Sequence, residues 1–279
     1  MDAQEERAWG LDSPGGILRE TFRIVGRHPL SILALGSLPW IAIDAVAALL
    51  GVRAPEWETL KQGLPASQRL SLWLWILYLL VTTLVVFPLV EGALTRAISE
   101  AYLRSSMSLG RAFRCAGHRW KALVGVHLRV LVRCAGVAIG TAIGAFLLVP
   151  FVLPESWPVG RVVLSSGAIV GGTYAYWLRW SLAIPMVVLE GVKPGMALAR
   201  SRTLTQGCRG WIFAVVVVGA VFTSLLNAGI RWVGMSGGTG VWLGTGLEFV
   251  ALPLVYLGQR RRQEGYTATE LAAALELEV

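Results

Sequence analysis

The chain has 279 residues, of which 55% are hydrophobic and 15% are charged, and its formal net charge is +8. A soluble domain carries about 25% charged residues, so the composition excludes a soluble globular protein. The 12 Trp, 8 Phe and 6 Tyr also exclude a disordered chain, which leaves a membrane protein.

Six segments are long and apolar enough to cross the hydrocarbon core of a bilayer, which takes about 20 helical residues. These predicted spans are residues 30–50, 70–90, 122–149, 162–189, 211–230 and 241–257. The sequence between the spans is too short to form a soluble domain. We therefore expect residues 1–279 to form one all-α membrane domain, a six-span bundle with tails at 1–28 and 258–279.

The distribution of Lys and Arg predicts the orientation, because positively charged loops stay on the cytoplasmic side. With the N-terminus inside, the inner segments hold 17 of the 25 cations, the outer loops hold five, and three lie within spans. Both termini are therefore predicted to be cytoplasmic, in the inner membrane of a bacterium, and the first span to be an uncleaved anchor. Anionic lipid headgroups account for the basic inner face without a nucleic acid partner.

Three basic amphipathic stretches, at residues 14–27, 109–119 and 194–209, each begin with proline or leucine followed by glycine and lead into a span. They predict interfacial helices on the cytoplasmic face and suggest three repeated units of one such helix plus two spans. The alternative is that any basic segment entering a membrane has this pattern. The cations predicted to bind lipid headgroups are Arg19, Arg23, Arg111, Arg114, Arg200 and Arg202.

Small residues recur every four positions in two spans, and this spacing lets helix backbones approach closely. The pattern predicts close packing between the third and fourth spans. Its members are Gly136, Gly140, Gly144, Gly167 and Gly171.

Charged residues inside the spans are the strongest candidates for a site, since each costs about 2.5 to 3.5 kcal/mol to insert. At about 1.5 Å per residue, Arg133, Arg179 and Glu248 all lie about 14 to 17 Å deep, near the bilayer midplane. Either one arginine pairs with Glu248 to clamp the spans, or the surplus positive charge forms a site for a lipid phosphate or a small anion. A third span over residues 134–153 would instead move Arg129 and Arg133 to the interface and dissolve this cluster. Further polar candidates are Asp44, His127, Arg129, Glu91 and Glu190.

The sequence offers no convincing catalytic or metal site. The string 234–238 matches a serine-nucleophile pattern, but no histidine follows Ser236 to act as its base. Cys115 and His118 could supply two metal ligands, whereas a structural site needs four. No phosphate-binding or dinucleotide motif occurs. We therefore expect no catalytic residue, no metal and no cofactor, with an intramembrane hydrolase as the least favoured class.

Several short strings resemble the membrane-domain family of glycerophosphoryl diester phosphodiesterases. They are Arg179 through Pro185, Glu190-Gly191, Ala197 through Gly207, Glu91 through Gly110, and Tyr256 through Tyr266. The resemblance implies a polytopic membrane region, which some members fuse to a phosphodiesterase barrel. That barrel is missing here, so the resemblance implies neither phosphodiesterase activity nor a catalytic residue. It places Glu190 at the inner interface without giving it a chemical role.

The function predicted first is a non-enzymatic membrane protein that binds or organises anionic phospholipids, or that scaffolds a membrane-protein partner or a second copy of itself. The alternative is a small transporter or channel for an anionic solute or lipid, with Arg133, Arg179 and Glu248 along its path.

Overall fold

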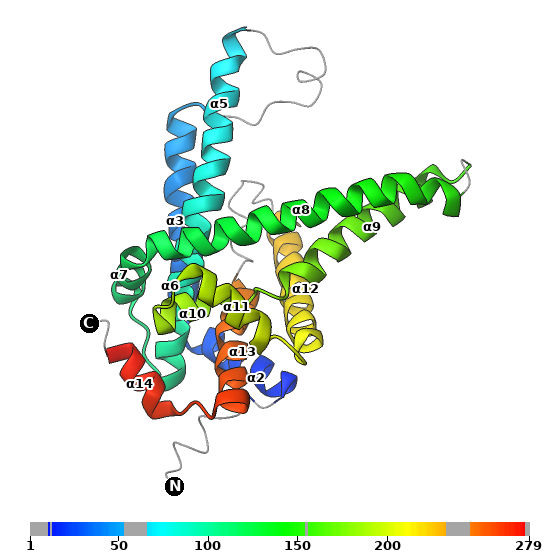
Figure 1. The fold of residues 1–279 in the computed structure, drawn as a ribbon. Coiled ribbons are helices and arrows are strands. Elements are labelled where there is room, and N and C mark those ends of the chain that lie inside the picture. The colour runs from blue at the N-terminus through cyan, green and yellow to red at the C-terminus, as the bar shows by residue number, and fades with distance from the viewer. Residues whose placement is uncertain (1–10, 12, 53–65, 154–155, 233–245, 277–279) are drawn as a thin grey trace.

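The structure is a computed structural model that describes residues 11, 13–52, 66–153, 156–232 and 246–276 (Figure 1). Helices and turns account for these residues and no strand occurs among them, so the predicted all-α class is confirmed for this part of the chain. The helices are α2 (Pro14–Arg27), α3 (Pro29–Leu49), α5 (Ala66–Val81), the π-helix η1 (Thr82–Val86), α6 (Phe87–Arg104), α7 (Leu109–His118), α8 (Trp120–Val152), α9 (Pro158–Trp177), α10 (Ala183–Glu190), α11 (Pro194–Leu204), α12 (Arg209–Trp232), α13 (Gly246–Glu264) and α14 (Ala268–Glu276).

The three basic stretches form the short helices α2, α7 and α11, and each precedes a longer apolar helix. Pro14 and Pro194 occupy the first helical positions, where a missing N–H is tolerated. The side chain of Ser13 caps α2 by accepting a hydrogen bond from the Gly16 N–H at 3.0 Å. Local sequence signals therefore fix where these helices begin.

Three helices are long and apolar enough to cross a membrane, by length and composition: Pro29–Leu49, Arg69–Arg104 and Trp120–Val149. A fourth is reached if α11 and the first part of α12, which meet at an angle of 101°, count as one broken span. Among the described residues the six-span prediction is therefore not confirmed.

The predicted fourth span, residues 162–189, is divided in two. Helix α9 ends at Trp177, residues 178–182 form a turn, and α10 begins at Ala183. Pro185 lies in the first turn of α10, where its lack of an N–H leaves no hydrogen bond unmade. Arg179 consequently lies in a turn and not within a continuous helix.

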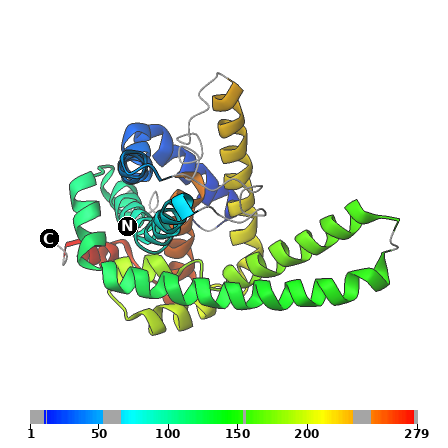
Figure 2. The same ribbon diagram turned by 90° about the horizontal axis from the view of Figure 1, so that it is seen from above.

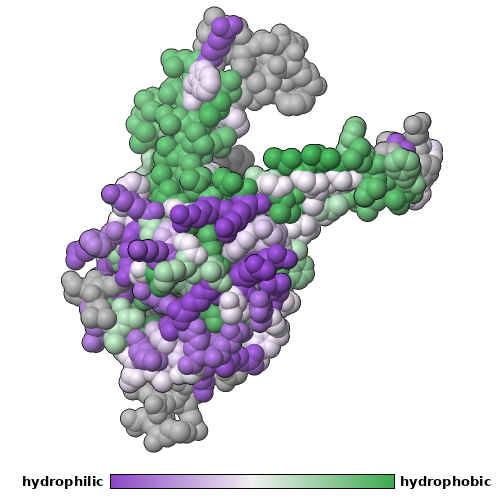
Figure 3. Space-filling view, in the orientation of Figure 1, coloured by the Kyte–Doolittle hydropathy of each residue, from purple (hydrophilic) through white to green (hydrophobic). Residues whose placement is uncertain are grey.

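A polar body carries two apolar helix pairs that project in different directions (Figures 1 and 2). Helices α3 and α5 form one pair, and α8 packs along α9 to form the other. Hydrophobic surface covers both pairs, whereas hydrophilic residues cover much of the body (Figure 3). Leu49 on α3 is 86% exposed and Phe151 on α8 is 89% exposed. Apolar surface of this extent is stable in hydrocarbon and unfavourable in water.

The core of the body forms where α6 packs against α10 and α13. Each of these three helices carries a proline followed by leucine or methionine and then valine, and the proline and the valine of each string are buried. The strings are 88–90, 185–187 and 253–255. These apolar side chains pack together, and their dispersion contacts contribute to association of the three helices.

The close contacts of the glycines differ from the prediction. A Cβ added at any of the five predicted glycines would meet no atom within 4 Å, although α8 and α9 do pack together. A Cβ at Gly172 would lie 3.0 Å from Thr141, and this is the tight point between the two helices. At Gly92 of α6 it would lie only 2.8 Å from Leu123 of α8.

The C-terminal helix α14 docks on α6. Thr267 and Glu270 form a reciprocal cap at its start, in which each side chain accepts a hydrogen bond from the other residue's backbone N–H. At its other end the Leu275 carbonyl accepts a hydrogen bond from the Arg96 guanidinium, and Leu275 itself is buried. The tail is thus an ordered part of the body up to Glu276.

Candidate functional site

Four of the six arginines predicted to bind lipid headgroups have exposed side chains, namely Arg19, Arg23, Arg114 and Arg202. They lie on α2, α7 and α11, the short helices that precede apolar helices. Arg23 also pairs with Glu20 one turn away, an exposed contact that is weak in water. These cations are available to an anionic surface.

The other two predicted headgroup ligands, Arg111 and Arg200, are bonded to carboxylates of the protein. Arg111 lies 3.6 Å from Glu100, a carboxylate that is 1% exposed and that also lies 3.4 Å from Arg96. Because a buried carboxylate must be compensated by nearby cations, we assign Arg111 and Arg200 a structural role.

Five side chains from three helices form what we call the Glu190 cluster: Glu190, Arg200, Tyr256, Arg260 and Glu264. Arg200 donates hydrogen bonds to Glu190 and, at 2.6 Å, to Glu264. Arg260 donates to Glu264 at 2.7 Å and lies 3.6 Å from Glu190, which also accepts from the Tyr256 hydroxyl. Two cations thus face two anions where the ends of α10 and α13 lie against α11.

The electrostatics of Glu264 follow from this arrangement. Partial burial opposes ionisation of its carboxyl, but hydrogen bonds from Arg200 and Arg260 outweigh that effect and lower its pKa below the usual value. Arg260 also lies over the ring of Tyr266, at 3.6 Å from the centroid. The cluster is an ion-pair network that favours the charged form of Glu264.

Sequence reasoning identified Glu190 and Arg200 separately and did not identify Tyr256, Arg260 or Glu264 as site residues. The signal was present, because all five residues fall within strings quoted for the family resemblance. The structure brings these distant strings together.

Two of the predicted midplane charges, Arg133 and Arg179, lie against one aromatic pair. The Arg133 guanidinium is 5.1 Å from the centre of the Trp180 ring, and that of Arg179 is 5.0 Å from the centre of the Tyr176 ring. The two rings meet edge to face at 4.5 Å. Helix α13 includes Glu248, but the side chain of this residue lies outside the described part, so a pair with either arginine remains a prediction.

The remaining polar candidates are Asp44, Arg129, Glu91 and His127. Asp44 of α3 accepts a hydrogen bond from the Tyr78 hydroxyl of α5 at 2.5 Å, which joins the first apolar pair. Arg129 is exposed on α8. Glu91 and His127 line a cavity.

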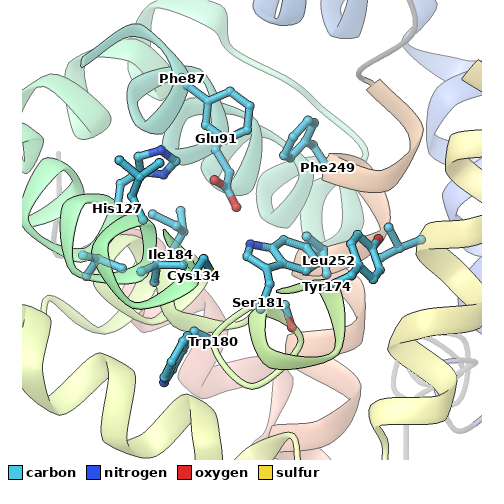
Figure 4. Close-up of a pocket in the computed structure, with 15 residues that line it drawn as sticks. Phe87, Glu91, His127, Cys134, Tyr174, Trp180, Ser181, Ile184, Phe249 and Leu252 are labelled. Atoms are coloured by element: carbon cyan, nitrogen blue, oxygen red, sulfur yellow. The ribbon is translucent and has the colours of Figure 1, made fainter. Parts of the chain in front are cut away.

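The cavity has a volume of about 310 Å³ and lies between α6, α8, α9, α10, α12 and α13. Its walls are mainly aromatic and aliphatic, and the Glu91 carboxylate points into it near His127 (Figure 4). Ser181 also lines the cavity, but its hydroxyl donates to the Leu178 carbonyl at 3.1 Å. No arginine or lysine is among its described lining residues.

In the described ranges no group of three His, Cys, Asp or Glu side chains could hold a metal ion. The predicted turn around Ser236 lies outside those ranges. Comparison with known protein families, curated proteins and solved structures gives no match to this chain. The family resemblance therefore stays a prediction.

Proposed function

We propose that this chain is an integral protein of the cytoplasmic membrane that binds and organises anionic phospholipids of the inner leaflet without catalysing a reaction. The observation that carries the proposal is the position of the exposed arginines Arg19, Arg23, Arg114 and Arg202 on the polar body. Each lies on a short helix that leads into an apolar helix. This arrangement supports contact between the four arginines and lipid headgroups.

Electrostatics give the expected strength of this binding. A cation near an anionic membrane surface contributes about 1 kcal/mol, and salt screens the attraction. Four such cations around one body favour anionic over zwitterionic lipid in the adjacent leaflet, while the exposed apolar helices keep the body at the membrane.

The proposal includes a topology. We infer three units, each with a short basic helix and two membrane crossings, with both termini in the cytoplasm. The order α2–α3–α5, α7–α8–α9 and α11–α12–α13 supports it, as do the related proline strings in α6, α10 and α13. A partner protein or a second copy could occupy the remaining apolar surface.

Retention of lipid by the purified protein tests the function. The protein, reconstituted with equal amounts of phosphatidylglycerol and phosphatidylcholine and then purified in mild detergent, should retain mainly phosphatidylglycerol by mass spectrometry. Replacement of Arg19, Arg23, Arg114 and Arg202 by Gln should abolish this preference. Arg69→Gln is the control, because Arg69 is exposed near the start of α5, far from the body.

Anion transport is the second candidate, favoured by the Arg133 and Arg179 guanidiniums on their aromatic pair. Reconstituted vesicles should then show anion flux that Arg179→Gln abolishes and that the four surface changes leave intact. Without lipid preference and without flux, both proposals fail and a scaffold remains.

A further inference from the structure

The residues that line the cavity have no role in the proposed binding of lipid at the surface. Five aromatic residues line it: Phe87, Tyr174, Trp177, Trp180 and Phe249. Phe87 of α6 meets Phe249 of α13 edge to face at 5.4 Å, and on α9 the rings of Tyr174 and Trp177 are also 5.4 Å apart. Aromatic groups from different helices thus form different parts of the wall.

Glu91 places a carboxyl group in this apolar cavity. The residue is 9% exposed, and its carboxylate points between the labelled rings of Phe249 and His127 (Figure 4). His127 lies against Phe87, with 5.2 Å between the ring centres. No lysine or arginine is among the described lining residues. The Arg133 guanidinium lies 5.1 Å from the ring centre of Trp180, which is one of them.

Aromatic faces and a carboxylate attract the same class of ligand. The face of an aromatic ring is negative and attracts cations, most effectively when the cation is freed from water. A small inorganic cation would lose strong hydration on entering such a cavity, whereas an alkylated ammonium is weakly hydrated and presents apolar groups to the walls. An ionised Glu91 carboxylate would repel an anionic headgroup.

We propose that this cavity is a binding site for an organic ammonium ion, with Glu91 as the counter-ion and the aromatic residues as the cage. The volume of about 310 Å³ suits a compact group such as a trimethylammonium with an attached ring or short chain. Either a soluble amphiphile or the choline headgroup of a lipid carries this chemistry. The site is distinct from the exposed arginines, so it can exist whether or not the surface selects anionic lipid.

Calorimetric titration of the full chain with phenyltrimethylammonium tests the site, in dodecyl maltoside because this detergent has no ammonium group. We expect saturable binding that Glu91→Gln weakens about tenfold or more, since the attraction at short range is lost. Trp177→Leu keeps the carboxylate, removes a ring and should weaken binding several-fold. Glu276→Gln is the matched control: it makes the same charge change at an exposed residue on α14 and should leave binding unchanged.

The charge of the ligand is tested with tert-butylbenzene, a neutral molecule of nearly the same shape, which should displace the probe at least about tenfold less effectively. Monomeric diheptanoyl phosphatidylcholine, compared with diheptanoyl phosphatidylglycerol, reports whether a lipid headgroup can be the source of the ammonium. Equal displacement by the neutral molecule would overturn the proposal, as would no binding to the wild type at about 10 mM probe.

Unchanged binding to a Glu91→Gln protein that elutes like the wild type would also overturn it. If Glu91→Gln does not fold, Trp177→Leu and the neutral molecule decide the question without it. Failure of phosphatidylglycerol retention would leave these results untouched, so the two proposals fail separately.

Discussion

Glu190 at the end of α10 accepts a hydrogen bond from the hydroxyl of Tyr256 in α13, although 66 positions separate the two residues. Tyr256 is 0% exposed, so this bond lies at the inner edge of the Glu190 cluster. Arg200 of α11 binds the same carboxylate from the more exposed side. Three helices are thereby joined through one side chain.

Loss of Arg200 should destabilise the body. In Arg200→Gln, Glu190 and Glu264 share Arg260 as their remaining cation in the Glu190 cluster. Because Arg200 is about one-third exposed, we expect a loss of about 1 to 2 kcal/mol in the free energy of unfolding. Chemical denaturation in detergent measures it.

Arg202→Gln is the control for this experiment, since Arg202 lies on the same helix, is exposed, and carries the same charge. Its unfolding free energy should change by less than about 0.5 kcal/mol. Equal losses in the two variants would show that the cluster contributes nothing specific.

The cluster should also make the protein sensitive to acid. The folded-state pKa of Glu264 lies below its ordinary value of 4.5 because the hydrogen bonds from Arg200 and Arg260 outweigh the effect of burial. Its contribution to stability is therefore present above pH 4.5 and is lost as the pH falls through the lowered pKa. Melting temperatures measured from about pH 6 to about pH 3 should fall more steeply in the wild type than in Glu264→Gln. Parallel curves would contradict this.

Helix class and the starts of the short helices could be predicted from the sequence, because both depend on local signals. Pro14, Ser13 and Pro194 act within one helical turn. The turn around Arg179 could not be predicted from the sequence, since residues 162–189 are apolar enough to continue as one helix. Where such a segment breaks depends on what packs against it.

The Glu190 cluster and the cavity show that the prediction of sites from the sequence is limited in the same way. Hydropathy and depth along single spans placed Arg133 and Arg179 at one level, but did not reveal that both lie against the Tyr176 and Trp180 rings. Glu91 can be recognised as a candidate site residue only when the aromatic rings that other helices place around the cavity are known. Contacts between distant segments depend on the tertiary arrangement, which periodicity does not contain.

Close packing at Gly92 gives a prediction about stability. A Cβ there would lie 2.8 Å from a methyl group of Leu123 and 3.4 Å from Val188, so Gly92→Ala forces the buried Leu123 side chain or the two helices to adjust. We expect a loss of about 1 to 3 kcal/mol. Gly136→Ala in α8 has open space around its Cβ and should be neutral or stabilising by up to about 1 kcal/mol, since alanine favours helix. Denaturation of both variants compares them, and the opposite order would show that the α6–α8 contact is looser than described.

Cysteine labelling tests the membrane topology at the two ends of the second apolar pair. Ser156 is exposed at the far end of α8 and α9, and Gln206 is exposed in the turn between α11 and α12 on the body. Single cysteines are introduced in a background in which Cys115, Cys134 and Cys208 are replaced. An impermeant maleimide should label Ser156→Cys in intact cells, because a pair that crosses the bilayer exposes its tip outside, and should label Gln206→Cys only after lysis. Protection of both positions in intact cells would mean that α8 and α9 lie along the inner leaflet, and labelling of Gln206→Cys alone would invert the orientation.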